Sequence, residues 1–151
     1  MMEVAGGLVE KALREVKDRH VFFADWLAGR IAETALDGAM HCFSPDFRRI
    51  APGGREMDRA ALTAWLAARR GIMPKSFAIE TADLQVVLDT AACAVVGYRE
   101  IQPGQTPPVR ISTAIFVPEE AAPNGVAWLH VQETWDSGDR QSRMETTGGM
   151  T

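Results

Sequence analysis

Five polar residues in the C-terminal half of the chain have side chains suited to holding or transforming a small molecule. They are Tyr98, Glu100, Thr113, His130 and Gln132. Under the strand pairing predicted below, they share one face of a sheet and gather at one end of it, beyond apolar neighbours. A small-molecule pocket combines an apolar wall with a few convergent polar groups in this way. The same residues could instead form a buried hydrogen-bond network that satisfies only itself, and the sequence leaves both interpretations open.

The first 29 residues are predicted to form one helix that packs on this face of the sheet. Apolar residues recur along it at spacings of three and four, and Gly29 is typical of a helix end. Phe22, Phe23 and Trp26 would close the pocket from the helix side. His20 lies in the middle of the apolar stripe, where a histidine is more often packed and hydrogen-bonded than catalytic.

The rest of the chain divides into further helices and then strands. Helices are predicted at residues 31–43 and 59–70, a short strand and hairpin at 47–55, and strands at 76–88, 91–102, 109–117 and 126–136. Asp58 is a suitable N-cap for the third helix. Because short links join the later strands, they are expected to form an antiparallel meander. This pattern predicts an α+β fold in one domain over residues 1–136, followed by a disordered polar tail at 137–151.

The opposite face of the predicted sheet mixes charged and large apolar side chains. Centring each loop between its strands places Arg110 opposite Glu133, an opposite-charge pair of the kind that stabilises a sheet. Leu129, Val131 and Trp135 are predicted on the same face. A mixed surface of this kind commonly meets a second subunit, so we expect a homodimer through it. A register shifted by one residue would exchange the two faces.

Composition argues against several classes of protein. The 151 residues carry 16 Lys+Arg against 20 Asp+Glu, a net charge of −4, which disfavours nucleic acid as a partner. No uncharged apolar run approaches the roughly 20 residues of a membrane span, and the N-terminus lacks the pattern of a secretory signal. Cys42 and Cys93 lie far apart, and the three histidines are scattered. The sequence therefore predicts a cytoplasmic protein with no metal and no organic cofactor.

Four segments carry a likeness that spans about residues 3 to 136. They are residues 20–29 (HVFFADWLAG), 45–54 (PDFRRIAPGG), 97–102 (GYREIQ) and 128–135 (WLHVQETW). Together they resemble the nuclear transport factor 2-like superfamily, in particular its SnoaL-like and ketosteroid isomerase-like members and its uncharacterised single-domain branch. The resemblance implies a cystatin-like α+β roll. In such a roll a strongly curved antiparallel sheet of four to six strands wraps the first helix as a cone around a pocket.

The resemblance also implies roles for particular residues. Enzymes of this superfamily place a general base, an Asp or a His, in the cone together with donors to a developing oxyanion. By this likeness His130 is the first candidate base and Asp83 the second, with Tyr98 and Gln132 as donors. The isomerase has a tyrosine on its first helix and this chain has none there, so the sequence does not reveal a complete catalytic set. The predicted pocket then comprises Trp26, Tyr98, Glu100, Thr113, Trp128 and Gln132.

Three functions stay open on these grounds. An isomerase- or cyclase-type enzyme would abstract a proton next to the carbonyl of an apolar substrate. A binding module would hold a small apolar or carbonyl-containing molecule without turnover. A dimeric assembly module would have a filled cone, with Trp26, Trp65 and Trp128 as ordinary core residues. The fold by itself does not decide among them, because one fold hosts many functions.

Overall fold

A computed structural model describes residues 7–136, which contain three helices and a six-stranded sheet. In chain order the elements are α1 (Val9–Leu27), α2 (Ala35–Met40), β1 (Phe43–Ile50), β2 (Glu56–Asp58), α3 (Arg59–Ala67), β3 (Glu80–Asp89), β4 (Ala94–Ile101), β5 (Val109–Pro118) and β6 (Val126–Asp136). The strand order is β2-β1-β6-β5-β4-β3. Neighbouring strands are antiparallel except β1 and β6, which are parallel. The predicted α+β fold is confirmed, with this one parallel pair as an addition.

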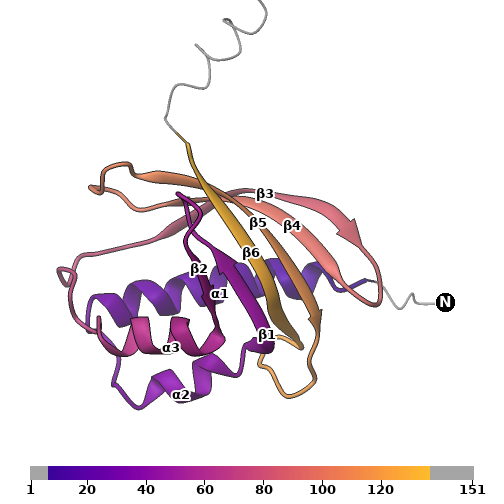
Figure 1. Ribbon diagram of the computed structural model, residues 1–151, viewed down its shortest axis with the longest axis horizontal. Helices are drawn as coiled ribbons and strands as arrows, with labels where there is room; N and C mark the ends of the chain where they lie inside the picture. The colour runs from indigo at the N-terminus through magenta and orange to yellow at the C-terminus, as the bar shows by residue number, and fades with distance from the viewer. Residues whose placement is uncertain (1–6, 137–151) are drawn as a thin grey trace, which may run out of the picture.

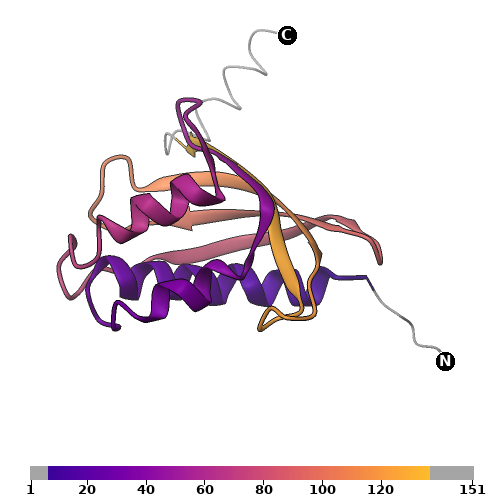
Figure 2. The same ribbon diagram turned by 60° about the horizontal axis from the view of Figure 1, so that its bottom comes forward.

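The sheet curves over the helices (Figures 1 and 2). On one side α1 packs against β3 and β4, and on the other α3 packs against β1 and β2. This is the curved sheet over a long helix that the resemblance implied. No helix within residues 7–136 has both the length and the apolar character that a membrane crossing requires. The predicted tail at 137–151 and the first six residues of the predicted first helix lie outside the described residues.

α1 ends where the sequence predicts. Gly29 has a φ of 70°, in the left-handed region that glycine adopts without a steric penalty. Its N–H donates to the Trp26 carbonyl at 3.0 Å, and the Arg30 N–H donates to the Asp25 carbonyl at 2.8 Å. These two bonds satisfy carbonyls in the last turn and form a Schellman motif. Trp26 is held in this way at the point where α1 meets the segment that follows α3.

The second helix is shorter than predicted, and the strand after it is longer. α2 covers only Ala35–Met40, and Phe43 begins β1 instead of ending a helix. Pro45 lies within β1, and the pairing of β1 with β6 is irregular between Phe43 and Arg48. Proline has no N–H to donate to a neighbouring strand, so it is tolerated at such an irregularity. The proline that predicted the end of a helix thus marks a bend in a strand.

The third helix begins as predicted and ends earlier. The Asp58 carboxylate accepts a hydrogen bond from the Ala61 N–H at 2.8 Å, which confirms Asp58 as the N-cap. α3 ends at Ala67, before the predicted end at Arg70. The residues between that end and Gly71 form turns, so the helix is about one turn shorter than the sequence predicted.

The predicted register between β4 and β5 was wrong by one residue. Ile101 pairs with Val109 and Glu100 pairs with Arg110, because Gln102 belongs to the loop, where its N–H donates to the Pro108 carbonyl at 2.8 Å. Side chains alternate between the two faces of a strand, so a shift of one residue exchanges the faces. The concave face of the sheet therefore carries both Glu100 and Arg110.

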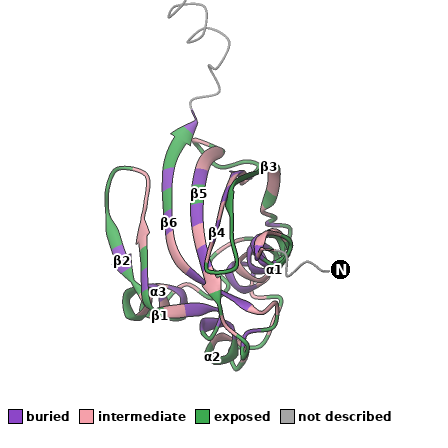
Figure 3. Cartoon of the chain, turned by 90° about the vertical axis from the view of Figure 1, so that its right-hand side faces the viewer, coloured by how far each residue is buried: buried purple, intermediate pink, exposed green. Residues whose placement is uncertain are grey.

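This shift moves the residues predicted for a homodimer. Arg110, Val131, Glu133 and Trp135 lie on the concave face and line the enclosed space instead of an outer surface. Figure 3 shows buried and more exposed residues alternating along β5 and β6. Leu129, the fifth residue of that prediction, is the extra residue of a bulge between the Ile115–His130 and Phe116–Trp128 pairs.

A buried carboxylate joins α1 to the far side of the fold. Glu15 is fully buried and accepts two hydrogen bonds from the Arg19 guanidinium, at 2.7 and 3.1 Å. It also accepts from Asn124 Nδ2 at 2.9 Å and from Trp128 Nε1 at 2.8 Å. A buried carboxylate is costly unless it is paired in this way. Glu15 therefore ties the middle of α1 to β6 and to the loop before it.

Candidate functional site

A cavity of about 520 Å³ lies between the concave face of the sheet, α1 and α3. Most of its wall is aromatic or aliphatic, from Phe23, Leu27, Phe43, Phe47, Met57, Leu62, Trp65, Leu66, Phe77, Ile79, Trp128 and Val131. Small-molecule sites commonly have volumes of about 300 to 1,000 Å³ and walls of this composition. The cavity is therefore large enough and apolar enough to hold an organic molecule.

Exposed residues from several segments mark the mouth of the cavity. Arg55 comes from the β1–β2 hairpin, Ile72 from the segment after α3, Gln105 from the β4–β5 loop and Trp135 from the end of β6. Ile72 and Trp135 are 63% and 43% exposed, so large apolar surface lies at the entrance. An apolar body entering here would contact hydrophobic side chains before it reaches the interior.

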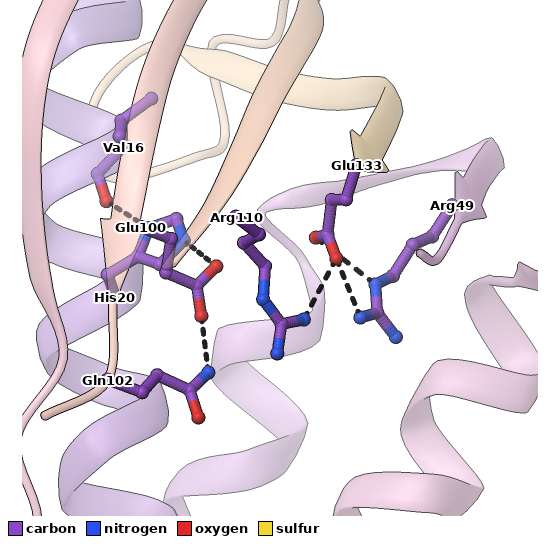
Figure 4. A network of polar contacts seen from close by, with 7 residues as sticks. All are labelled: Val16, His20, Arg49, Glu100, Gln102, Arg110 and Glu133. Atoms are coloured by element: carbon purple, nitrogen blue, oxygen red, sulfur yellow. Dashed lines mark hydrogen bonds and ion pairs between the residues drawn. The ribbon is translucent and has the colours of Figure 1, made fainter. Parts of the chain in front are cut away.

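His20 and Glu100 form a buried pair in the cavity wall (Figure 4). Nε2 of His20 lies 3.1 Å from Oε1 of Glu100, and Nδ1 lies 2.7 Å from the carbonyl oxygen of Val16. Gln102 donates to the other oxygen of Glu100 at 2.6 Å. A carboxylate and a carbonyl are both acceptors, so both ring nitrogens must carry a proton to bond them. The pair is an imidazolium facing a carboxylate.

The pKa shifts of the two residues agree with this assignment. Burial by itself would lower the pKa of His20, but the charge of Glu100 and the hydrogen bonds to Glu100 and Val16 outweigh it and raise that pKa. Burial would raise the pKa of Glu100. This effect of burial is outweighed by the charge and hydrogen bond of His20, followed by the charge of Arg110 and the hydrogen bond from the Gln102 amide. Together they lower the pKa of Glu100 to about 2. Each charge stabilises the other.

A second buried cluster centres on Glu133 of β6 (Figure 4). Arg49 donates to it through Nη2 at 2.9 Å and Nε at 3.3 Å, and Arg110 donates through Nη1 at 3.0 Å. The side chains of Arg49, Arg110 and Glu133 are only 17%, 16% and 7% exposed, respectively. The Arg110 guanidinium also lies 4.8 Å from the centre of the Trp135 ring. Two guanidinium groups share one carboxylate, so the cluster retains one positive charge.

Tyr98 lines the cavity between these two clusters. Its hydroxyl is buried, and burial together with the charges of Glu100 and Glu133 raises the pKa of Tyr98 well above 10. The ring packs edge-on against His20, with the ring centres 5.3 Å apart. Tyr98 therefore stays a neutral phenol.

The structure brings three of the predicted pocket residues to the cavity wall, namely Tyr98, Glu100 and Trp128. Trp26 lies beside the cavity in the core, 2% exposed, where its Nε1–H donates to the Leu66 carbonyl at 2.7 Å. Trp26 therefore holds α1 against α3 and does not line the site.

Thr113 and Gln132, predicted in the pocket, pair with each other on the convex face of the sheet, and both are exposed. His130 pairs with Ile115 on this same face. None of the three can reach the cavity, because the one-residue shift between β4 and β5 turned their side chains to the opposite face. This corrects the placement of His130 as a base in the pocket.

Asp83, the second predicted base, lies on β3 outside the cavity. It has a φ of 54°, and its Oδ2 lies 3.0 Å from Nε of Arg99. The backbone turns locally here, since the pairing of β3 with β4 is irregular between Ala82 and Gln85. Neither predicted base is therefore in position to act on a molecule in the cavity.

Sequence reasoning missed the arginine cluster. The sequence pattern does not single out Arg49, and it places Arg110 and Glu133 on a dimer surface. The signal was present, because Arg110 and Glu133 alternate with large apolar residues on their strands, and their opposite charges predicted an ion pair. That ion pair is confirmed, although the residue that pairs with Arg110 across the strands is Trp135.

The chemistry available in the cavity is that of hydrogen-bond donors and fixed charges. Within residues 7–136, no group of three or more His, Cys, Asp or Glu side chains is arranged to hold a metal ion. Both cavity carboxylates already accept bonds from protein groups, at Glu100 and Glu133. The wall can therefore hold an apolar body and donate N–H groups to an oxygen.

Comparison with known proteins agrees with this architecture. No protein-family model and no curated protein matches the chain. Among solved structures, an uncharacterised cystatin-like fold protein from Caulobacter vibrioides is 13% identical to this chain. The alignment covers 89% of this chain and 94% of the Caulobacter chain, with a TM-score of 0.62. A calcium/calmodulin-dependent protein kinase II hub from S. rosetta is 12% identical, with coverages of 89% and 98% and a TM-score of 0.58. These two likenesses show the fold.

An NTF2-like protein of unknown function from Pseudomonas aeruginosa is more similar. It is 30% identical to this chain, and the alignment covers 83% of this chain and 98% of the Pseudomonas chain, with a TM-score of 0.75. The sequence identity, the coverage and the shared fold agree with the resemblance carried by the four segments. The chain belongs to the nuclear transport factor 2-like (NTF2-like) proteins.

Proposed function

We propose that the protein binds a small organic molecule in the cavity without converting it. The single observation that supports this most strongly is the combination of a 520 Å³ space and an aromatic wall with buried arginine side chains held in place by Glu133. The apolar body of the ligand would pack against Phe43, Phe47 and Trp128. An oxygen of the ligand would accept N–H groups from the arginine cluster.

Binding is favoured over isomerase- or cyclase-type proton transfer by the state of the candidate bases. A general base works best when its pKa lies near the operating pH. The Glu100 carboxylate has a pKa lowered to about 2 and is a weak base. His20 has an acceptor at each ring nitrogen, so in its protonated form it offers no lone pair.

Membership of the SnoaL-like or ketosteroid isomerase-like groups, and a cytoplasmic location, remain predictions of the sequence.

A cavity-filling variant tests the proposed binding. We would screen apolar aromatic and carbonyl compounds by thermal shift against wild type, Val131→Trp and Thr113→Trp. Val131 lines the cavity and Thr113 lies on the convex face. Ligands should raise the melting temperature of wild type and of Thr113→Trp, and leave that of Val131→Trp unchanged. No binding to wild type, or equal shifts in all three proteins, would overturn the proposal.

A second candidate function, assembly of copies of this chain, has a separate observation in its favour. The chain is similar in fold to a kinase hub, and the convex face of its sheet carries Ile111 and Ile115, both half-buried beside exposed Thr113. We would measure mass in solution for wild type, Ile115→Arg and Val21→Arg, the last a control on α1 at 59% exposure. Assembly through this face predicts that only Ile115→Arg becomes monomeric, whereas a monomeric wild type would exclude it.

A further inference from the structure

We infer that the ligand is an organic acid with a single carboxylate on an apolar body, and that Arg110 binds this carboxylate. The inference rests on the proposed binding function and adds the chemical class of the ligand. It is carried by the charges of the cavity wall, by the unused donors of Arg110 and by the apolar surroundings of that side chain.

The cavity wall carries an excess of positive charge. Four arginines line it, Arg49, Arg55, Arg69 and Arg110, against two glutamates, Glu100 and Glu133. Counting side chains alone, this leaves two positive charges before His20 is included. The whole chain has a net charge of −4, so the positive wall is a local feature that runs against the overall charge. A cleft lined by one sign of charge attracts ligands of the opposite sign.

The excess is located on particular residues. Glu100 is matched by His20, and Glu133 is shared by Arg49 and Arg110. Among residues 7–136, neither Arg55 nor Arg69 forms an ion pair with an acid. Arg69 lies over the Trp65 ring at 4.7 Å and donates to the Trp65 carbonyl. One uncompensated cation thus lies inside the cavity at the Glu133 cluster, and Arg55 and Arg69 supply the others.

Arg110 has donors left for a ligand. A guanidinium has five N–H donors in a planar fork. Only one nitrogen of Arg110, Nη1, donates to an acceptor within the described part of the chain, and that acceptor is Glu133. Arg49 instead uses Nε and Nη2 on Glu133 and contacts the Met57 sulfur through Nη1. Arg110 is therefore the buried guanidinium with a free edge, and a carboxylate matches that edge with two parallel bonds.

The charge balance favours one carboxylate over a dianion. The Glu133 cluster holds two cations and one anion, so a single negative charge makes it neutral. A second negative charge in the same place would face Glu133 and Glu100 in a poorly screened interior. The Trp135 ring covers one face of the Arg110 guanidinium, which leaves the planar edge for a planar group.

A matched series of probes tests this inference on the whole chain. We would measure the binding of 2-naphthoate, neutral 2-naphthamide, cationic 2-naphthylmethylammonium and dianionic 2-naphthyl phosphate by calorimetry and ligand-observed NMR. A charge-assisted pair stabilises by about 1.5 to 3 kcal/mol, so naphthoate should bind at least about tenfold more tightly than naphthamide. The ammonium compound should bind most weakly, and the phosphate more weakly than naphthoate.

Two variants locate the carboxylate. Arg110→Met should remove the preference for naphthoate while naphthamide still binds, and Arg48→Met is the matched control because Arg48 is 64% exposed and outside the cavity. Glu133→Gln should act in the opposite direction. It frees donors on Arg49 and Arg110, so naphthoate affinity should rise by about tenfold or more. If Glu133 had only a structural role, Glu133→Gln would instead lower the affinity for naphthoate.

The outcomes separate the two proposals. Equal binding of naphthoate and naphthamide would support ligand binding in the cavity and overturn the carboxylate inference. The carboxylate inference would also be overturned if Arg110→Met folds and binds naphthoate with unchanged affinity. Tighter binding of the phosphate would replace the single carboxylate with a dianion and overturn the inference. If no probe of the series binds, the proposed binding function falls together with the inference.

Discussion

Nε2 of His20 on α1 lies 3.1 Å from Oε1 of Glu100 on β4, and this buried ion pair joins residues 80 positions apart in the chain. The contact fixes the long helix against the sheet inside the cavity. It also gives His20 an acceptor at each ring nitrogen, since Nδ1 bonds the Val16 carbonyl. The pair therefore serves the shape of the cavity, and its energy depends on the charge of both partners.

The first prediction concerns stability and pH. Folding raises the pKa of His20 above 6.5, so its contribution is complete below pH 6.5 and is lost as pH rises through the raised value. Folding lowers the pKa of Glu100 from 4.5 to about 2, so its contribution is complete above pH 4.5 and is lost as pH falls toward 2. The free energy of unfolding from this pair should be greatest between about pH 4.5 and 6.5.

Urea denaturation between pH 3 and 9 measures this dependence. His20→Gln should lose the decline on the alkaline side, whereas His130→Gln should keep it, because His130 lies on the convex face. An alkaline decline that is the same in His20→Gln and wild type would show that other groups cause it.

The second prediction concerns the buried Glu15 carboxylate. Glu15→Ala leaves the Arg19 guanidinium and the Trp128 Nε1–H without their acceptor and removes one of the two acceptors of Asn124, which keeps Asp18. Removing one partner of a buried ion pair typically costs about 3 to 5 kcal/mol. Urea denaturation should show a loss of that size, against less than about 0.5 kcal/mol for exposed Glu10→Ala. Similar losses in the two variants would mean that the Glu15 network adds little.

The third prediction concerns the start of α3. Asp58 accepts the Ala61 N–H, so Asp58→Ala should lower the free energy of unfolding by about 1 kcal/mol and Asp58→Asn by much less. Asp46→Ala is the control, because Asp46 is exposed and its side chain caps no helix. Equal effects at positions 46 and 58 would contradict the cap.

The fourth prediction concerns the two thiols. Burial, followed by the charge of Glu15, raises the pKa of Cys42 to about 11, and the thiolate is the reactive form. Cys93 is partly exposed and free. A thiol reagent at pH 8 should therefore modify Cys93 in the native protein and Cys42 only after unfolding, as read by mass spectrometry of peptides. Rapid labelling of native Cys42 would show that the core around Glu15 opens readily.

The order of elements was predictable because each rests on local signals. Gly29 ends α1 and Asp58 begins α3 through bonds to residues a few positions away. The cavity residues depend on non-local pairing. Whether Glu100 or Ile101 faces Arg110 is decided by the conformation of one loop, and no periodicity within β4 or β5 specifies it. Arg49 reaches the site through the parallel pairing of β1 with β6, which short links cannot make.

That parallel pairing also sets the order in which the molecule can be completed during synthesis. β1 and β2 have no sheet to join until β6 has been made, and the Arg49–Glu133 ion pair spans 84 positions of the chain. Such long-range contacts form late, because chain entropy is lost before they stabilise anything. β3, β4 and β5 can pair as hairpins earlier. The cavity is therefore complete only after β6 has been synthesised, and a nascent chain that stops short of β6 should be unable to hold a ligand there.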